Sequence, residues 1–99
     1  MDRRREYRYA VELPGTLQFA GYATKRMWFS YVSANGCRIT GGDVERLSPG
    51  DVIDLDLGPV GAGQATVRWT KDKAAGVEFH VSLHPSIVEY LAMFLTRAA

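Results

Sequence analysis

The chain has 99 residues, one cysteine and a formal net charge of +1. A single cysteine excludes a scaffold built on intramolecular disulfides, and a hydrophobic content of 46% excludes a disordered chain. The near-neutral charge argues against a general DNA- or RNA-binding protein, because such proteins neutralise many phosphates at once. No apolar run reaches about 18 residues and the first residues are charged, so we expect one compact cytoplasmic domain without membrane insertion.

The first eight residues are the most basic part of the chain. Their basic residues are Arg3, Arg4, Arg5 and Arg8, and only Asp2 and Glu6 offset them. Such a cluster is either a local anion site or a solvated basic tail. We expect residues 1–12 to form a flexible arm in front of a domain that spans residues 13–99.

The central part of the chain has the pattern of short strands separated by polar turns. Positions 53, 55 and 57 are apolar and positions 54 and 56 are aspartates, and this period of two predicts a strand with one solvated face. The six predicted strands are residues 13–19, 25–33, 36–40, 52–57, 64–70 and 75–81. In the fifth, Val67 and Trp69 alternate with Thr66 and Arg68. We expect Trp69, like Trp28, to pack in the core or at its rim.

The dipeptide Asn35-Gly36 separates the second and third predicted strands. Asn-Gly favours a type I′ turn, which needs positive φ at both central residues. The sequence therefore predicts a tight hairpin centred on this pair.

The hydrophobic period changes to that of a helix after Pro85. The apolar stripe consists of Ile87, Val88, Leu91, Phe94 and Leu95. Ser86 and Glu89 have the spacing of a capping box, and we expect a helix over about residues 85–97. Several short strands with one terminal helix predict a mainly β protein, a small antiparallel barrel of about six strands with a C-terminal α-helix packed on it.

Two clusters of residues resemble the signatures of one family. The first is a pair of arginines followed, after three variable residues, by another arginine, and it is carried by Arg3, Arg4 and Arg8. The second has Asp or Asn, then Ser two residues later and Gly three residues after that, and Ser33 and Gly36 match it. With further similarity at residues 47–51, 67–69 and 76–79, nearly the whole chain resembles the PilZ family.

The resemblance implies a receptor for cyclic di-GMP that is not an enzyme and needs no cofactor. Its implied ligand-binding residues are Arg3, Arg4, Arg8, Tyr31, Ser33 and Gly36. Guanidinium groups suit this ligand, because their planar donors match both phosphates and guanine edges. In the family the arginine segment wraps over ligand held on the barrel surface.

Tyr31 departs from the family pattern, since it stands where the family has Asp or Asn. A tyrosine offers no carboxylate or amide to the guanine edge, although its ring can stack on the base. In a regular strand Tyr31 and Ser33 share one face. Whether Tyr31 abolishes or tolerates ligand binding stays open at this point.

Three functions follow from these patterns. The first is a cyclic di-GMP receptor that signals by ligand-dependent contact with a partner protein. The second, favoured by Tyr31, is a divergent PilZ adaptor that binds no nucleotide and acts as a protein-interaction module. The third, a single-stranded nucleic-acid binder, is disfavoured by the near-neutral charge.

Other candidate sites have ordinary structural explanations. Cys37, His80 and His84 make an incomplete zinc set of unsuitable spacing. Asp54 and Asp56 have no accompanying nucleophile motif, and the solvent face of a barrel explains them. We assign no catalytic and no metal-binding residue.

Overall fold

A computed structural model describes residues 9–58, 61–91 and 93 of the chain. The strands are β1 (Tyr9–Gln18), β2 (Lys25–Val32), β3 (Gly36–Gly41), β4 (Val52–Asp56), β5 (Ala62–Lys71) and β6 (Ala74–Phe79). The helices are the 3₁₀ turn η1 (Val44–Arg46) and α1 (Pro85–Tyr90). β1 thus begins at Tyr9, within the range expected for the arm.

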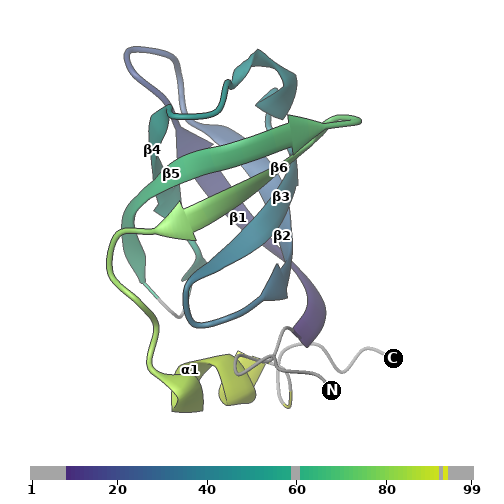
Figure 1. The fold of residues 1–99 in the computed structure, drawn as a ribbon, viewed down its shortest axis with the longest axis vertical. Coiled ribbons are helices and arrows are strands. Elements are labelled where there is room, and N and C mark those ends of the chain that lie inside the picture. The colour runs from purple at the N-terminus through teal and green to yellow at the C-terminus, as the bar shows by residue number, and fades with distance from the viewer. Residues whose placement is uncertain (1–8, 59–60, 92, 94–99) are drawn as a thin grey trace.

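The six strands form one closed antiparallel barrel in the order β1-β2-β3-β6-β5-β4 (Figure 1). Closure follows from β1, which pairs with β2 along one side and with β4 along the other. The prediction of a small, mainly β barrel with one C-terminal helix is confirmed. Among the described residues no helix has the length and apolar character needed to cross a membrane.

The interior is filled by alternate side chains of every strand. Ile53 and Leu55 of β4 are buried, whereas Asp54 and Asp56 are exposed, so the predicted solvent face of this strand is confirmed. The other strands supply inward residues that include Leu17, Met27, Phe29, Ile39, Val67 and Val77. A barrel of this size is packed solid by its own side chains, and ligands must therefore bind on its outer face or at its ends.

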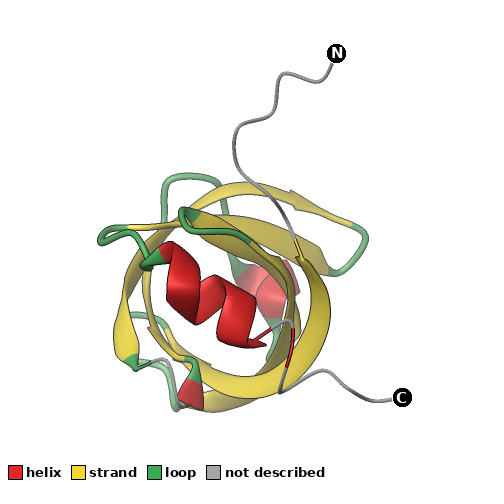
Figure 2. Cartoon of the chain, turned by 90° about the horizontal axis from the view of Figure 1, so that it is seen from below, coloured by secondary structure: helices red, strands yellow, loops and turns green. Residues whose placement is uncertain are grey.

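A helical element closes each end of the barrel. At one end η1 inserts the buried side chain of Val44, and Leu47 follows it inward. At the other end α1 lies across the opening, with Val88 and Leu91 buried (Figure 2). These two residues confirm part of the predicted apolar stripe, while Phe94, Leu95 and the end of the predicted helix lie outside the described residues.

The predicted capping box at Ser86 is wrong. α1 begins at Pro85, and its N-cap is His84, whose Nδ1 accepts a hydrogen bond from the Ser86 backbone N–H at 3.1 Å. Proline is favoured at the first helical position and holds the preceding residue in an extended conformation, here at ψ 141° for His84. Ser86 therefore lies within the first turn, and Glu89 is too far along the helix to complete a box.

The predicted type I′ turn at Asn35-Gly36 is also wrong, because neither residue has positive φ. The Ser33 N–H donates to the Gly36 carbonyl at 2.9 Å, which leaves Ala34 and Asn35 as the loop. Position 36 requires glycine for another reason. A Cβ there would overlap the backbone carbonyl oxygen of Val77 on β6, so the glycine permits close approach of β3 and β6.

We predict that Gly36→Ala lowers the free energy of unfolding by about 1–3 kcal/mol, because two backbones must move apart to admit the methyl group. Gly63→Ala on β5 is the matched control, since its Cβ would meet no atom within 4 Å and its φ is ordinary. It should be neutral or slightly stabilising. Urea denaturation of both variants measures the difference, and equal stability of the two would contradict this explanation of Gly36.

Candidate functional site

A hollow of about 470 Å³ lies on the outer face of the barrel, over β2, β3, β6 and β5. Its lining residues are Tyr31, Ser33, Asn35, Gly36, Cys37, Arg38, Arg68, Trp69, Gly76, Val77 and Glu78. The structure therefore brings together three of the six residues that the sequence implicates in ligand binding, namely Tyr31, Ser33 and Gly36. The other three, Arg3, Arg4 and Arg8, lie outside the described residues.

Tyr31 reaches the hollow because β2 has a bulge at this position. Ser30 pairs with Arg38, and the next contact joins Ser33 to Gly36. Between these contacts β2 has two residues and β3 has one, which defines a β-bulge. Tyr31 takes φ 49° there, in the left-handed region that side chains other than Asn and Asp rarely adopt.

The bulge interrupts the inside-outside alternation that a regular strand would impose. Tyr31 is 47% exposed, whereas Val32 and Ser33 are both buried. Tyr31 and Ser33 nevertheless line the same hollow. Their proximity thus depends on the bulge and not on the period of two that the sequence analysis used.

Ser33 shapes the loop between β2 and β3. Only 3% exposed, it is the one buried polar side chain among the described residues. Its Oγ donates to the Gly36 carbonyl oxygen at 3.4 Å and accepts the Asn35 N–H at 3.3 Å. Both contacts are long for hydrogen bonds of this type, so we assign the hydroxyl a loop-stabilising role that leaves capacity for another partner.

The same loop is tied to the segment that leads into α1. The Asn35 carbonyl accepts the Phe79 N–H at 2.8 Å, and the Ala34 carbonyl accepts the Leu83 N–H at 2.7 Å. The Ser82 hydroxyl also donates to Asn35 Oδ1 at 2.7 Å. The loop at one edge of the hollow is therefore fixed to the chain that closes this end of the barrel.

Arg38 and Trp69 are candidate site residues that the sequence analysis missed. Ser30, Arg38, Gly76 and Trp69 pair in turn across four neighbouring strands and form one row over the outer face. The Trp69 indole lies directly over Gly76, where a Cβ would overlap its Nε1. Arg38 and Trp69, each paired with Gly76, thus line the same hollow.

Neither Trp69 nor Trp28, which the sequence predicts to lie in the core or at its rim, packs in the core. They are 44% and 48% exposed, respectively. For Trp69 the cause is a second bulge, between Val67 and Trp69, which shifts the register against β6. The sequence signal for this bulge is Gly76, which lies opposite Trp69. The pairing of these two residues becomes known only from the register of β5 against β6.

Charges are distributed unevenly around the hollow. Arg68 Nε lies 3.4 Å from Glu78 Oε1, and both side chains are more than half exposed. Arg38 is in no ion pair with another described residue. A guanidinium without an ion pair among the described residues and an exposed indole in the same hollow suit a ligand that combines anionic groups with planar rings.

The remaining candidate residues have separate structural roles. His80 Nε2 is hydrogen-bonded to Thr66 Oγ1 at 2.8 Å, and His84 caps α1. Cys37 is buried in the core. Within the described part of the chain no group of three His, Cys, Asp or Glu residues is arranged to hold a metal ion.

Comparison with known protein families gives a match over nearly the whole chain. The family model described as PilZ domain matches residues 2–97, a range that contains both signature clusters and every residue of the hollow. No curated protein matches the sequence significantly.

We predict that Tyr31→Asn is more stable than Tyr31→Ala by about 0.5–1 kcal/mol. Both variants remove the ring, but Asn tolerates the left-handed region better than Ala does, because its short polar side chain can hydrogen-bond locally. Tyr31→Gly should also exceed Tyr31→Ala, since glycine pays no Cβ penalty at positive φ. Denaturant titration of the three variants tests this, and an alanine variant that equals the other two would exclude backbone strain at position 31.

Cys37 should be unreactive in the folded protein. Burial raises the pKa of its thiol from 9.0 to about 12, and the thiolate is the reactive form. Ellman's reagent at pH 8 should label it only after denaturation, and prompt stoichiometric labelling of the folded protein would contradict the buried position. Because the folded pKa is raised, the thiol's contribution to stability is present below pH 9 and declines between about pH 9 and 12.

Proposed function

Because the chain belongs to the PilZ domain family, we propose that it is a cyclic di-GMP receptor of the bacterial cytoplasm. In this proposal it is not an enzyme and signals by ligand-dependent contact with a partner protein. The observation that carries the proposal is the hollow itself. It gathers Tyr31, Ser33 and Gly36 of the second signature beside a guanidinium and an exposed indole.

The start of β1 supports a role for the arginine cluster at this hollow. Tyr9 pairs with Val32, the residue between Tyr31 and Ser33. Arg8 is bonded to Tyr9, and consecutive Cα atoms are about 3.8 Å apart. β1 therefore begins beside the part of β2 that borders the hollow.

The chemistry of the lining matches the proposed ligand. Arg38 would contact a phosphate or a guanine edge, and the exposed face of Trp69 would stack on a guanine. The hollow's volume of about 470 Å³ falls within the range of about 300–1,000 Å³ for small-molecule sites. Arg3, Arg4 and Arg8 would close over the ligand from the arm.

The energies of these contacts are of the size that micromolar binding requires, even without an Asp or Asn at position 31. A charge-assisted hydrogen bond contributes about 1.5–3 kcal/mol, and stacking on an aromatic side chain about 1–3 kcal/mol per base. A micromolar complex needs about 8 kcal/mol in total. Three or four arginine contacts and one stacked base contribute about 5–15 kcal/mol before the cost of ordering the arm is subtracted, and this range includes the value for a micromolar complex.

The alternative of an adaptor without nucleotide binding rests on one observation. Tyr31 replaces the family's Asp or Asn and is held at the hollow by a bulge with positive φ. If its ring occupies the place of a guanine, the hollow serves as a protein contact instead. The titration below distinguishes the two functions.

We predict that calorimetric titration with cyclic di-GMP gives a dissociation constant in the micromolar range or below, whereas GTP gives no comparable binding. Arg4→Ala should weaken binding at least about tenfold, since it removes one charge-assisted contact. Arg26→Ala is the matched control, because Arg26 is an exposed arginine of β2 outside the hollow.

Tryptophan fluorescence adds a site-specific measurement. The change on adding ligand should persist in Trp28→Phe and disappear in Trp69→Phe, because only Trp69 lines the hollow. No heat and no fluorescence change with cyclic di-GMP at about 100 µM, where a micromolar complex would be saturated, would instead favour the adaptor.

A further inference from the structure

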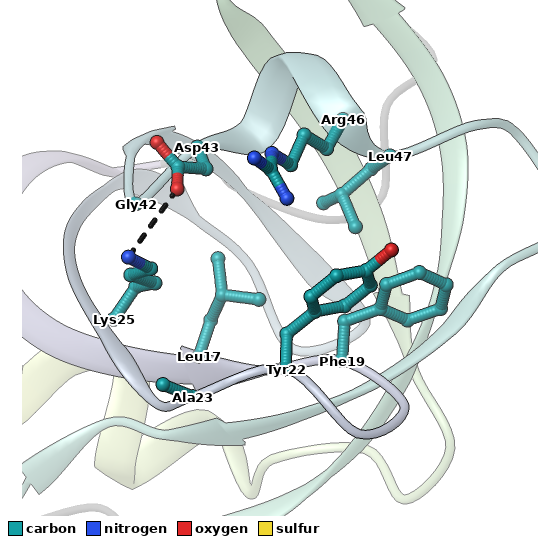
Figure 3. Close-up of a pocket in the computed structure, with 9 residues that line it drawn as sticks. All are labelled: Leu17, Phe19, Tyr22, Ala23, Lys25, Gly42, Asp43, Arg46 and Leu47. Atoms are coloured by element: carbon teal, nitrogen blue, oxygen red, sulfur yellow. Dashed lines mark ion pairs between the residues drawn. The ribbon is translucent and has the colours of Figure 1, made fainter.

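A second pocket lies at the η1 end of the barrel, between η1 and the connection from β1 to β2 (Figure 3). We propose that it binds one hydrophobic side chain of a partner protein, next to an acidic residue in the partner's chain. This inference deepens the proposed function, since it names the surface and the chemistry of the partner contact. It depends on the proposed function in one respect, namely that the protein has a partner protein.

The pocket is apolar at its base and polar at its rim. It is lined by Leu17, Phe19, Tyr22, Ala23, Lys25, Gly42, Asp43, Arg46 and Leu47. Leu17 and Leu47 are buried and belong to the barrel core. Phe19 and Tyr22 form one wall, with their rings stacked at a centroid distance of 6.0 Å.

The volume of the pocket limits the size of the group that can bind in it. The volume is about 140 Å³, close to the roughly 150 Å³ that accommodates one benzene ring. Small-molecule sites usually measure about 300–1,000 Å³, so a nucleotide does not fit within this pocket. A single aromatic or aliphatic anchor does fit, and such anchors in pockets dominate the binding energy of protein interfaces.

The charge at the rim indicates what flanks the anchor. Asp43 Oδ2 is paired with Lys25 Nζ at 3.5 Å. Arg46 lies over the Tyr22 ring, with its guanidinium carbon 5.5 Å from the centroid, and within the described residues it forms no ion pair. Figure 3 shows its guanidinium directed over the pocket. Among the unmodified side chains of a partner protein, carboxylates are the groups that the planar donors of an arginine match in bidentate geometry.

The walls of the pocket are fixed before a partner binds. The Arg46 N–H donates to the Asp43 carbonyl at 2.9 Å and the Leu47 N–H to the Val44 carbonyl at 3.0 Å. On the opposite wall the Tyr22 N–H donates to the Phe19 carbonyl at 3.0 Å. A preformed pocket loses little conformational entropy on binding, which favours its use as an anchor site.

The pocket and the hollow lie at opposite ends of β2. Lys25 at the start of this strand lines the pocket, whereas Tyr31 near its end lines the hollow. Figure 1 shows the β1–β2 connection and η1 at the end of the barrel away from α1. Cyclic di-GMP and the partner would therefore bind at separate places and at the same time.

The test is a titration of the ¹⁵N-labelled protein with the blocked peptide acetyl-Gly-Ser-Phe-Asp-Ser-Gly-amide, followed by NMR. We expect chemical-shift changes concentrated at residues 17–25 and 42–47. Peptides with Ala for Phe or with Lys for Asp should bind at least about tenfold more weakly. Arg46→Gln should reduce affinity for the Asp peptide to that of the Lys peptide, whereas Arg26→Gln, the matched arginine control outside the pocket, should leave it unchanged.

Three results with the peptides would overturn the proposal. They are the absence of shifts in these segments, equal binding of all three peptides, and full binding by Arg46→Gln with an unchanged fold in its spectrum. Phenylacetate that binds as tightly as the peptide would also overturn it, since the site would then serve a free aromatic acid. A parallel titration with cyclic di-GMP reports on residues 31–38, so failure of the receptor proposal and failure of the anchor pocket are observed separately.

Discussion

Closure of the sheet is the constraint on which the rest of the molecule depends. β1 pairs with both β2 and β4, so every strand of the barrel has a hydrogen-bonded neighbour on each side. The interior of six closed strands holds only their own side chains, while the two ends must be covered. η1 and α1 supply those covers. Recognition is thereby confined to the outer face and the rims, where the hollow and the anchor pocket lie.

Two β-bulges help to form the hollow, which a barrel of regular strands would lack. A smooth antiparallel strand alternates its side chains and offers a nearly flat outer face. The bulge at Tyr31 and the one between Val67 and Trp69 each turn an additional side chain outward. Bulges are frequent next to binding sites for this reason. Gly76 completes the same arrangement, because its lack of a side chain leaves room for the Trp69 indole.

The sequence predicts the parts of this structure that depend on local patterns. The alternation at positions 53–57 identifies β4, and the change of period after Pro85 identifies α1. Ser33 and Gly36 of the second signature both line the hollow. The features that the sequence does not predict depend on pairing between segments that are distant in the chain. The position of Trp69 follows from register against β6, and the need for glycine at 36 follows from the approach of Val77.

The hydrogen bonds between the β2–β3 loop and the chain before α1 have a mechanical consequence. Ala34 and Asn35 hold Phe79, Ser82 and Leu83 through backbone and side-chain contacts. These hydrogen bonds join the loop to the end of β6 and to the segment that leads into α1, so the loop and this segment are expected to open together in amide exchange. A ligand that moved the loop at the border of the hollow would therefore also change the support of the helix that covers this end of the barrel.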